Sequence, residues 1–117
     1  MAMTNIIYKI EEANIWAAAQ AAGNYTGSPL DIADGFIHLS AGDQVRETAD
    51  KWFEGRLGLV LVHIDADVLG ETLKWEGSRD GALFPHNYGP LPMSAVLDVE
   101  PMLLDGDGKH MFGPQIA

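Results

Sequence analysis

The stretch from Leu57 to Asp65 constrains the fold more than any other part of the sequence. In an extended strand, positions 59, 61 and 63 face one way and positions 60, 62 and 64 face the other. All of these positions except His63 are apolar, so both faces of the strand are largely apolar. A strand of this kind is covered on both sides. We therefore expect it to lie in the centre of a sheet.

Weaker patterns place the remaining elements around this strand. We expect strands at 6–10, 36–40, 72–76 and 95–104, helices at 11–23 and 43–55, a helical turn at 66–70, and loops at 24–35 and 77–92. Two main helices provide too few crossovers for a doubly wound parallel sheet. The sequence therefore predicts a single α+β domain with mostly antiparallel strands over residues 1–104, followed by a C-terminal tail at 105–117.

The two predicted helices each have an apolar face. On the first, Trp16 is the largest apolar side chain, and we expect it to anchor the helix to the core. On the second, Asp43 is suited to the N-cap, and apolar residues recur at helical spacing at positions 45, 49, 52 and 53. We expect this whole stripe, Trp52 included, to be part of the core.

Composition excludes several classes of protein. The chain has no cysteine, which excludes a disulfide framework, a zinc ribbon and a thiol nucleophile. Its 17 acidic residues against 7 basic ones give a formal net charge of -10, which argues against a nucleic-acid partner. The longest apolar run, Leu57 to Val62, is too short to span a bilayer, and residues 1–10 lack the features of a signal peptide. We therefore expect a cytoplasmic protein that has no membrane partner.

Two histidines lie beside the long predicted loops. His38 follows the first loop and, on an extended strand, shares a face with Ser40, while His86 lies in the second loop, two residues before Tyr88. Two loops of this size in a small domain favour a cleft between them. There, histidine can contact ribose hydroxyls or act as an acid or base, and tyrosine can stack on a planar ring. A rigid, purely structural loop around His86 explains the same residues, so spacing alone leaves both interpretations open.

Trp75 and Glu76 end one of the predicted strands. The carboxylate of Glu76 could orient a nucleophile or stabilise positive charge that develops at a sugar carbon. Packing of Trp75 and solvation of Glu76 explain the pair equally well. A Ser-His-Asp hydrolase is less well supported, because no serine lies in a nucleophile elbow.

The other two histidines do not predict a metal site. His63 lies inside the central strand, where a core histidine with a satisfied hydrogen bond is the better interpretation, although Asp65 and Asp67 follow at ligand-like spacing. His110 lies in the polar tail, and we expect it to be solvated. The segment from Asp105 to Lys109 begins like a calcium-binding loop but lacks the later acidic ligands, so we expect a turn there and no metal cofactor.

Several short pieces of the sequence together resemble a family of short, mostly bacterial proteins, the domain-of-unknown-function family 952. The pieces are Ile7-Tyr8-Lys9-Ile10, Gly27-Ser28 with Asp31, Asp34-Gly35-Phe36-Ile37-His38-Leu39-Ser40, Gln44-Val45 with Thr48-Ala49, Leu59-Val60-Leu61-Val62, Trp75-Glu76, and Phe84-Pro85-His86 with Tyr88-Gly89-Pro90-Leu91. They extend over nearly the entire chain. The resemblance implies an ADP-ribosyltransferase-like fold of two abutting, mostly antiparallel sheets, with a cleft that holds NAD in active relatives.

The resemblance also implies roles for particular residues. In that superfamily, a histidine followed two residues later by serine or threonine contacts the ribose and nicotinamide of NAD, and His38 and Ser40 match this pattern. A stacking aromatic residue and a third polar residue complete such a site, and here several residues are available for each role. The candidate catalytic residues are His38, His86 and Glu76, and the candidate ligand-binding residues are Ser40, Tyr88, Trp75 and Arg79.

The leading hypothesis is therefore a protein that binds NAD or a related small nucleotide and transfers or hydrolyses ADP-ribose. The acidic surface favours a small nucleotide over RNA, because one or two local cations can hold a short ligand. One alternative is a non-catalytic ligand-binding or interaction module with the same cleft. A further alternative is a small-metabolite hydrolase that uses histidine and glutamate and needs no NAD.

Overall fold

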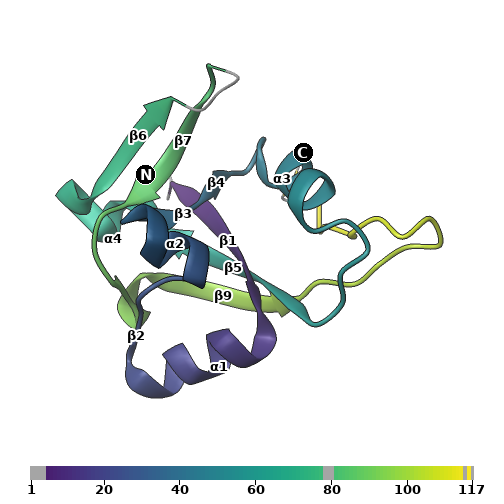
Figure 1. The fold of residues 1–117 in the computed structure, drawn as a ribbon, viewed down its shortest axis with the longest axis horizontal. Coiled ribbons are helices and arrows are strands. Elements are labelled where there is room, and N and C mark those ends of the chain that lie inside the picture. Colours follow the sequence, from purple (N-terminus) through teal and green to yellow (C-terminus); the bar gives the residue numbers. More distant parts are fainter. Residues whose placement is uncertain (1–4, 78–80, 115, 117) are drawn as a thin grey trace.

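The largest sheet of the protein has four antiparallel strands in the order β4-β1-β5-β9. The computed structural model describes residues 5–77, 81–114 and 116. The four strands are β4 (Ser40–Ala41), β1 (Ile6–Glu12), β5 (Leu59–Asp65) and β9 (Val96–Pro101), as Figure 1 shows. The expectation that the 59–65 strand is central is confirmed, because β5 pairs with β1 on one side and with β9 on the other.

The two faces of β5 belong to two separate hydrophobic clusters, as the alternation of its side chains predicts. Leu61 packs in one cluster with Val45 of α3 (Val45–Trp52). Val62 packs in the other with Trp16 of α1 (Ala13–Ala22), which is 2% exposed. The two helices therefore cover opposite faces of the sheet, and Trp16 anchors α1 as expected.

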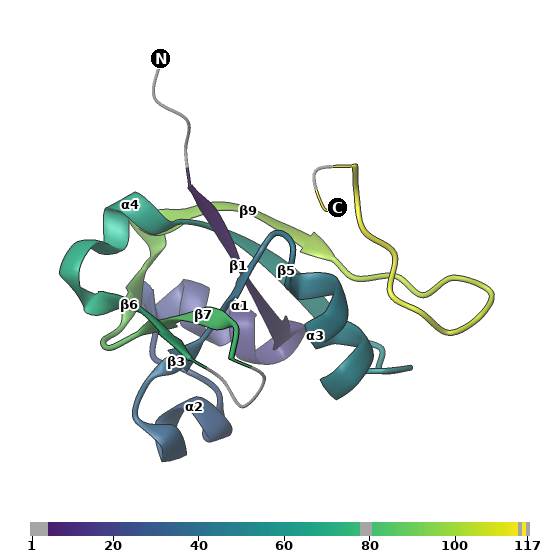
Figure 2. The same ribbon diagram turned by 90° about the horizontal axis from the view of Figure 1, so that it is seen from above.

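A second, smaller sheet carries most of the predicted site residues. Its strands β3 (Ile37–His38), β7 (Leu83–Asn87) and β6 (Leu73–Gly77) pair antiparallel in the order β3-β7-β6. A short additional pair joins β2 (Asn24–Tyr25) to β8 (Leu91–Pro92). Figures 1 and 2 show β6 and β7 on the opposite side of the molecule from β9. The strand expected at 72–76 is confirmed as β6.

The expectation of a loop at 24–35 is wrong, because this segment contains β2 and α2 (Pro29–Asp34). The hydroxyl of Ser28 accepts a hydrogen bond from the backbone N of Asp31 at 3.1 Å, and the carboxylate of Asp31 accepts one from the backbone N of Ser28 at 2.9 Å. Such a reciprocal capping box, with proline at the first helical position, begins a helix. Gly35, with a φ of 88°, ends it.

The expectation of a loop at 77–92 is also wrong for most of the segment that the structure describes, because it contains β7 and β8. Pro85 is typical of loops and lies here in the middle strand of the smaller sheet. Proline cannot donate to the ladder, but its carbonyl accepts a hydrogen bond from the backbone N of Leu39 at 3.0 Å. Its neighbours His86 and Asn87 keep the pairing with β3.

The two expected main helices are present as α1 and α3, α2 is an additional helix, and the expected boundaries differ. The described residues contain four helices, with α4 (Ala66–Leu69) at the predicted helical turn, and two short 3-10 helices at Gly70–Thr72 and Met93–Ala95. The helix α3 begins at Val45 instead of Asp43, and its Trp52 is 63% exposed. The expected apolar stripe is therefore shorter than its spacing suggests.

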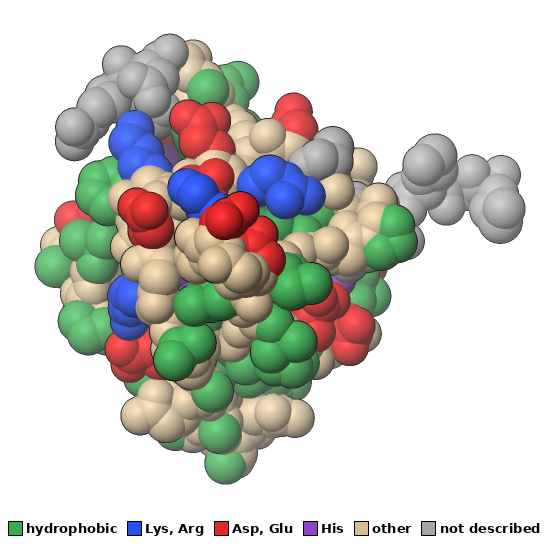
Figure 3. All heavy atoms as spheres, turned by 90° about the vertical axis from the view of Figure 1, so that its right-hand side faces the viewer, with side chains coloured by type: hydrophobic (Ala, Val, Ile, Leu, Met, Phe, Trp, Pro, Cys, Tyr) green, Lys and Arg blue, Asp and Glu red, His purple; other side chains and the backbone are tan. Residues whose placement is uncertain are grey.

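The segment after residue 104 packs against the four-stranded sheet. Phe112 and Ile116 join the cluster that contains Leu61. The expectation of a solvated His110 is wrong, because this residue is 4% exposed and its Nε2 lies 3.0 Å from the carbonyl oxygen of Arg56. Figure 3 views this side of the molecule, where Lys and Arg side chains lie beside Asp and Glu side chains. None of the helices in the described ranges is long and apolar enough to cross a membrane.

Candidate functional site

The smaller sheet brings four of the predicted site residues into contact. His38 of β3 and His86 of β7 are cross-strand partners, with ring centroids 5.7 Å apart. The Nδ1 atom of His86 lies 2.8 Å from Oε1 of Glu76 on β6. The hydroxyl of Tyr88, just after β7, donates a hydrogen bond of 2.6 Å to the same carboxylate oxygen. Two histidines, a carboxylate and a phenol therefore lie together on one face of the sheet.

Phe36 provides an aromatic base for these residues. Its ring stacks on that of His86, with centroids 4.2 Å apart and planes inclined by 24°. The centroids of His38 and Tyr88 lie 4.6 Å and 5.3 Å from it. Phe36, His38, Glu76, His86 and Tyr88 are called the histidine cluster below. Phe36 is not among the predicted site residues, although its strand alternation with His38 places the two side chains on one face.

Glu76 is the acceptor at the centre of the histidine cluster. The hydrogen bonds from Tyr88 and His86 hold the pKa of the Glu76 carboxyl below its usual range. The hydrogen bond between Tyr88 and Glu76 also raises the pKa of the Tyr88 hydroxyl. Glu76 is therefore ionised and Tyr88 is a donor at neutral pH, so the cluster presents a negative charge beside the rings of His86 and Tyr88.

Asp31 of α2 contacts both the ring and the backbone of His38. Its Oδ1 lies 2.7 Å from Nδ1 of His38 and accepts a hydrogen bond from the His38 backbone N at 3.1 Å. Burial alone would raise the pKa of the Asp31 carboxyl, but the hydrogen bond with His38 and the charge of Lys9 outweigh it and hold that pKa well below its usual range. Asp34 Oδ2 lies 3.0 Å from the other ring nitrogen of His38. Both ring nitrogens of His38 are therefore in contact with carboxylates.

A buried polar network supports Asp31 in turn. Lys9 of β1 donates hydrogen bonds to Asp31 Oδ2 at 2.8 Å and to the carbonyl oxygen of His38 at 3.0 Å. The hydroxyl of Tyr25 donates to Asp31 and to Glu11, and burial together with the Glu11 carboxylate raises the pKa of Tyr25. Lys9 and Glu11 are 7% and 5% exposed. Lys9 and Glu11 alternate with apolar residues along β1, a pattern that indicates a buried polar network and is not among the predictions above.

Ser40 lies apart from the histidine cluster. The expectation of one strand at 36–40 is wrong, because Leu39 separates β3 of the smaller sheet from β4 of the larger one. The buried hydroxyl of Ser40 lies 3.0 Å from that of Thr48 on α3. The change of sheet thus directs Ser40 toward α3, while His38 faces His86.

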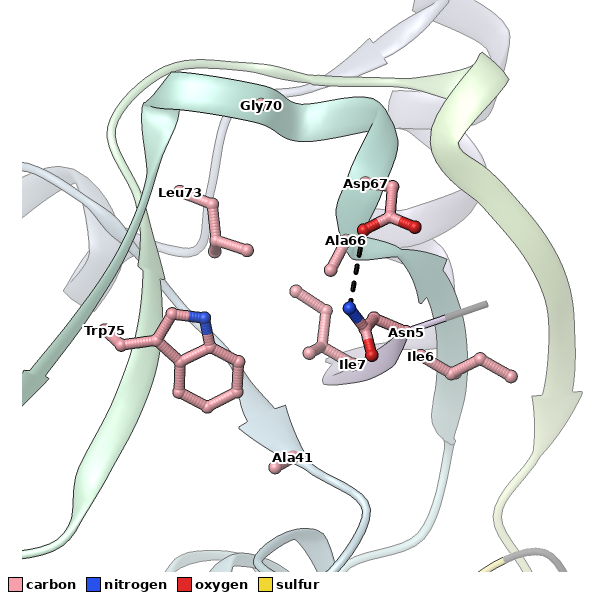
Figure 4. Close-up of a pocket in the computed structure, with 9 residues that line it drawn as sticks. All are labelled: Asn5, Ile6, Ile7, Ala41, Ala66, Asp67, Gly70, Leu73 and Trp75. Atoms are coloured by element: carbon pink, nitrogen blue, oxygen red, sulfur yellow. Dashed lines mark hydrogen bonds between the residues drawn. The ribbon is translucent and has the colours of Figure 1, made fainter. Parts of the chain in front are cut away.

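Trp75 lies on the opposite face of the smaller sheet from Glu76, as expected for neighbours on a strand. It lines a cavity of about 540 Å³ between this sheet and β1, with Leu73 beside it and Ile7 and Ala66 across the space (Figure 4). A second cavity of about 250 Å³ lies beside α2 and is bordered by Phe36. The last predicted site residue, Arg79, lies outside the described residues.

A comparison with known families finds the same family that the short sequence pieces indicate. A family model described as "Protein of unknown function (DUF952)" matches residues 10–99. The chain belongs to this family. The matched residues of the DUF952 protein include all of the strands and helices that hold the histidine cluster.

Solved structures similar to this DUF952 protein come from one bacterium. The crystal structure of protein CC0527 from Caulobacter crescentus is 54% identical, with a TM-score of 0.86 over 91% of this chain and 93% of that chain. A solution NMR structure of CC0527 is 55% identical, with a TM-score of 0.80 over 89% of this chain and 90% of that chain. The search of curated proteins finds no match. These comparisons support the α+β fold and leave the chemistry to the geometry of the site.

One group of residues outside the histidine cluster has the geometry to hold a metal ion. His63, Asp98 and Glu100 offer ligand atoms that all lie within 4.8 Å of one another. His63 Nε2 lies 2.8 Å from Glu100 Oε2, which confirms the expected hydrogen bond of a core histidine. Asp65 instead caps α4 by accepting a hydrogen bond from the backbone N of Asp67.

Proposed function

We propose that the DUF952 protein binds NAD or a related nucleotide at the histidine cluster and transfers or hydrolyses its ADP-ribose. The convergence of His38, Glu76, His86 and Tyr88 on one face of the smaller sheet carries the proposal. We further propose that the two sheets form an ADP-ribosyltransferase-like fold and that the protein is cytoplasmic. The family resemblance and the absence of cysteine support these two statements.

The chemistry of the cluster suits the nicotinamide end of NAD. Nicotinamide in NAD is a flat cationic ring, and aromatic faces attract such cations, above all when a carboxylate is near. Phe36 and Tyr88 provide the faces, and the ionised Glu76 provides the charge.

Other groups suit the rest of a nucleotide. Because Nδ1 of His86 contacts Glu76, its Nε2 is the ring nitrogen that a ribose hydroxyl could contact. Lys74 is the cross-strand partner of His86, and its charge contributes to the lowered pKa of Glu76. A single local cation of this kind can hold a phosphate despite the net charge of -10.

The contact between His86 and Glu76 also supports a second candidate function. A carboxylate that holds Nδ1 of a histidine orients the ring as a general base. With the 2.8 Å contact to Glu76, His86 could activate water for hydrolysis of a small metabolite without NAD. A third candidate function is a module that binds a ligand through the same residues without catalysing a reaction.

Binding is tested by thermal shift and calorimetry with NAD, ADP-ribose and nicotinamide. A ligand at a hundred times its dissociation constant adds about 2.7 kcal/mol to the free energy of unfolding, which raises Tm by several degrees. We expect this shift in the wild type and in Trp52→Ala, an exposed control on α3, and its loss in His38→Ala and His86→Ala. If none of the three compounds changes Tm at millimolar concentration, the proposal fails.

Chemistry is tested separately by measuring nicotinamide release from NAD. We expect release by the wild type and by Glu71→Gln, which changes an exposed carboxylate outside the cluster. Glu76→Gln should lose release while it retains part of the binding, because the amide keeps the shape and removes the charge. Binding without release by the wild type would favour the non-catalytic module.

A further inference from the structure

A cavity lies on the face of the smaller sheet that the histidine cluster does not use. Its volume of about 540 Å³ falls in the range of sites for small organic ligands. Ile7, Ala41, Ala66 and Leu73 supply an apolar lining. Figure 4 shows that these side chains surround a space between Trp75 on one side and Asn5 with Asp67 on the other.

Trp75 is partly open to this space. Its side chain belongs to β6, yet the residue is 47% exposed. Trp16, by comparison, is 2% exposed in the core. A partly exposed indole over an apolar lining offers a flat surface on which a ligand ring can stack, and its face attracts cations.

The polar side of the cavity accepts hydrogen bonds. Nδ2 of Asn5 donates to Oδ1 of Asp67 over 3.4 Å, and the same amide carries a carbonyl oxygen that can accept a hydrogen bond. Asp67 alone carries a charge among the lining residues that the structure describes. A ligand that fits this side therefore needs N–H donors and a positive charge.

We propose that this cavity binds a small organic cation, namely a primary ammonium group attached to a flat apolar body. The ammonium group contacts Asp67 and the carbonyl oxygen of Asn5, and the apolar body packs against Trp75. The site does not depend on nucleotide binding, because Trp75 and Glu76 project from opposite faces of β6.

Benzylamine is the probe for this proposal, and NMR of the indole N–H groups is the readout. The chain has 3 tryptophans, and a Trp75→Phe variant assigns the signal of Trp75. We expect benzylamine to shift that signal in a saturable manner. Benzyl alcohol, which has the same shape without the charge, should bind about five- to tenfold more weakly, and benzoate should not bind.

Two variants test the role assigned to Asp67. Asp67→Asn should raise the Kd of benzylamine about five- to tenfold, because it removes the charge and keeps the shape. Glu71→Gln, a matched change of an exposed carboxylate outside the lining, should leave the Kd unchanged. Asn5→Leu removes the amide acceptor and serves as a second test if Asp67→Asn lowers stability.

Three results would overturn the proposal. The first is the absence of a saturable shift of the Trp75 signal with benzylamine. The second is equal affinity for benzylamine and benzyl alcohol, which would show that Asp67 does not recognise the positive charge of the ligand. The third is an equal effect of Asp67→Asn and Glu71→Gln, which would indicate attraction by the acidic surface as a whole.

Discussion

The two faces of the smaller sheet differ in nearly every property that matters for ligand binding. One face carries the histidine cluster, in which each polar side chain is held by a carboxylate or a phenol. The other face carries Trp75 beside a cavity in which Asp67 is the one charged lining residue that the structure describes. Trp75 and Glu76 are adjacent in sequence and belong to different faces. The comparison shows that strand alternation divides a pair of neighbours between two distinct chemical environments.

Replacement of Asp31 should cause the largest loss of stability, because its carboxylate forms a buried ion pair with Lys9 and also contacts His38. Asp31→Ala leaves Lys9, whose side chain is 8% exposed, without its carboxylate partner. Removal of one partner of a buried ion pair costs about 3–5 kcal/mol, and urea unfolding measures the loss. Asp34→Ala is the control, since Asp34 is half-exposed and should cost less than about 1 kcal/mol. Equal losses in the two variants would show that the buried ion pair of Asp31 stabilises the fold no more than the half-exposed contact of Asp34 does.

The lowered pKa of Asp31 predicts a dependence of stability on pH. A carboxyl whose pKa is lower in the folded state than in the unfolded chain stabilises the fold above the unfolded pKa, which is about 3.9 for aspartate. This stabilisation is lost as the pH falls from about 5 toward the folded pKa. We expect the free energy of unfolding to fall over this range in the wild type and to fall less in Asp31→Asn. Parallel pH profiles for the two proteins would contradict this account.

Glu76→Gln separates the two faces by function. The variant removes the negative charge beside the aromatic rings, so the affinity for NAD should fall about tenfold, which corresponds to about 1.4 kcal/mol. The affinity for benzylamine should not change, because the Trp75 cavity lies on the other face. Calorimetry with both compounds measures the two affinities in one preparation. A parallel fall in both would mean that one site extends through the sheet.

Much of the fold was predictable from patterns that span a whole strand. The alternation from 59 to 65 predicted the central strand and its two clusters, and the turn at 66–70 was confirmed as α4. The helix α2 was missed because Gly, Pro and Asp residues were interpreted as a loop, although Ser28 and Asp31 form a capping box there. The strand β7 was missed because Pro85 is typical of loops, and only pairing with two neighbours reveals it.

The site was predictable to a smaller extent, since it depends on contacts between distant segments. Sequence selected His38, His86, Glu76 and Tyr88, whose pairing across β3, β7 and β6 requires the three-dimensional fold. It also placed Ser40 beside His38, because nothing local indicates that the chain changes sheets at Leu39. Asp31 was visible as part of a sequence piece, but its contact with Lys9 joins residues 22 positions apart.

Ser40→Ala should have the smallest effect on stability and on NAD affinity, and it tests whether Ser40 lies outside the histidine cluster. Loss of the contact between Ser40 and Thr48 should reduce the free energy of unfolding by about 1 kcal/mol. The affinity for NAD should stay within twofold of the wild type, because the Ser40 hydroxyl faces α3. Thermal unfolding and calorimetry measure the two quantities. A loss of affinity for NAD without a loss of stability would show that Ser40 contacts the ligand.

The most direct test of two separate faces is a pair of NMR titrations of one labelled sample. The imidazole signals of His38 and His86 report one face, and the indole signal of Trp75 reports the other. We predict that NAD shifts the two imidazole signals and leaves the indole unchanged, whereas benzylamine shifts the indole and leaves the imidazoles unchanged. Movement of all three signals with either compound would contradict the account.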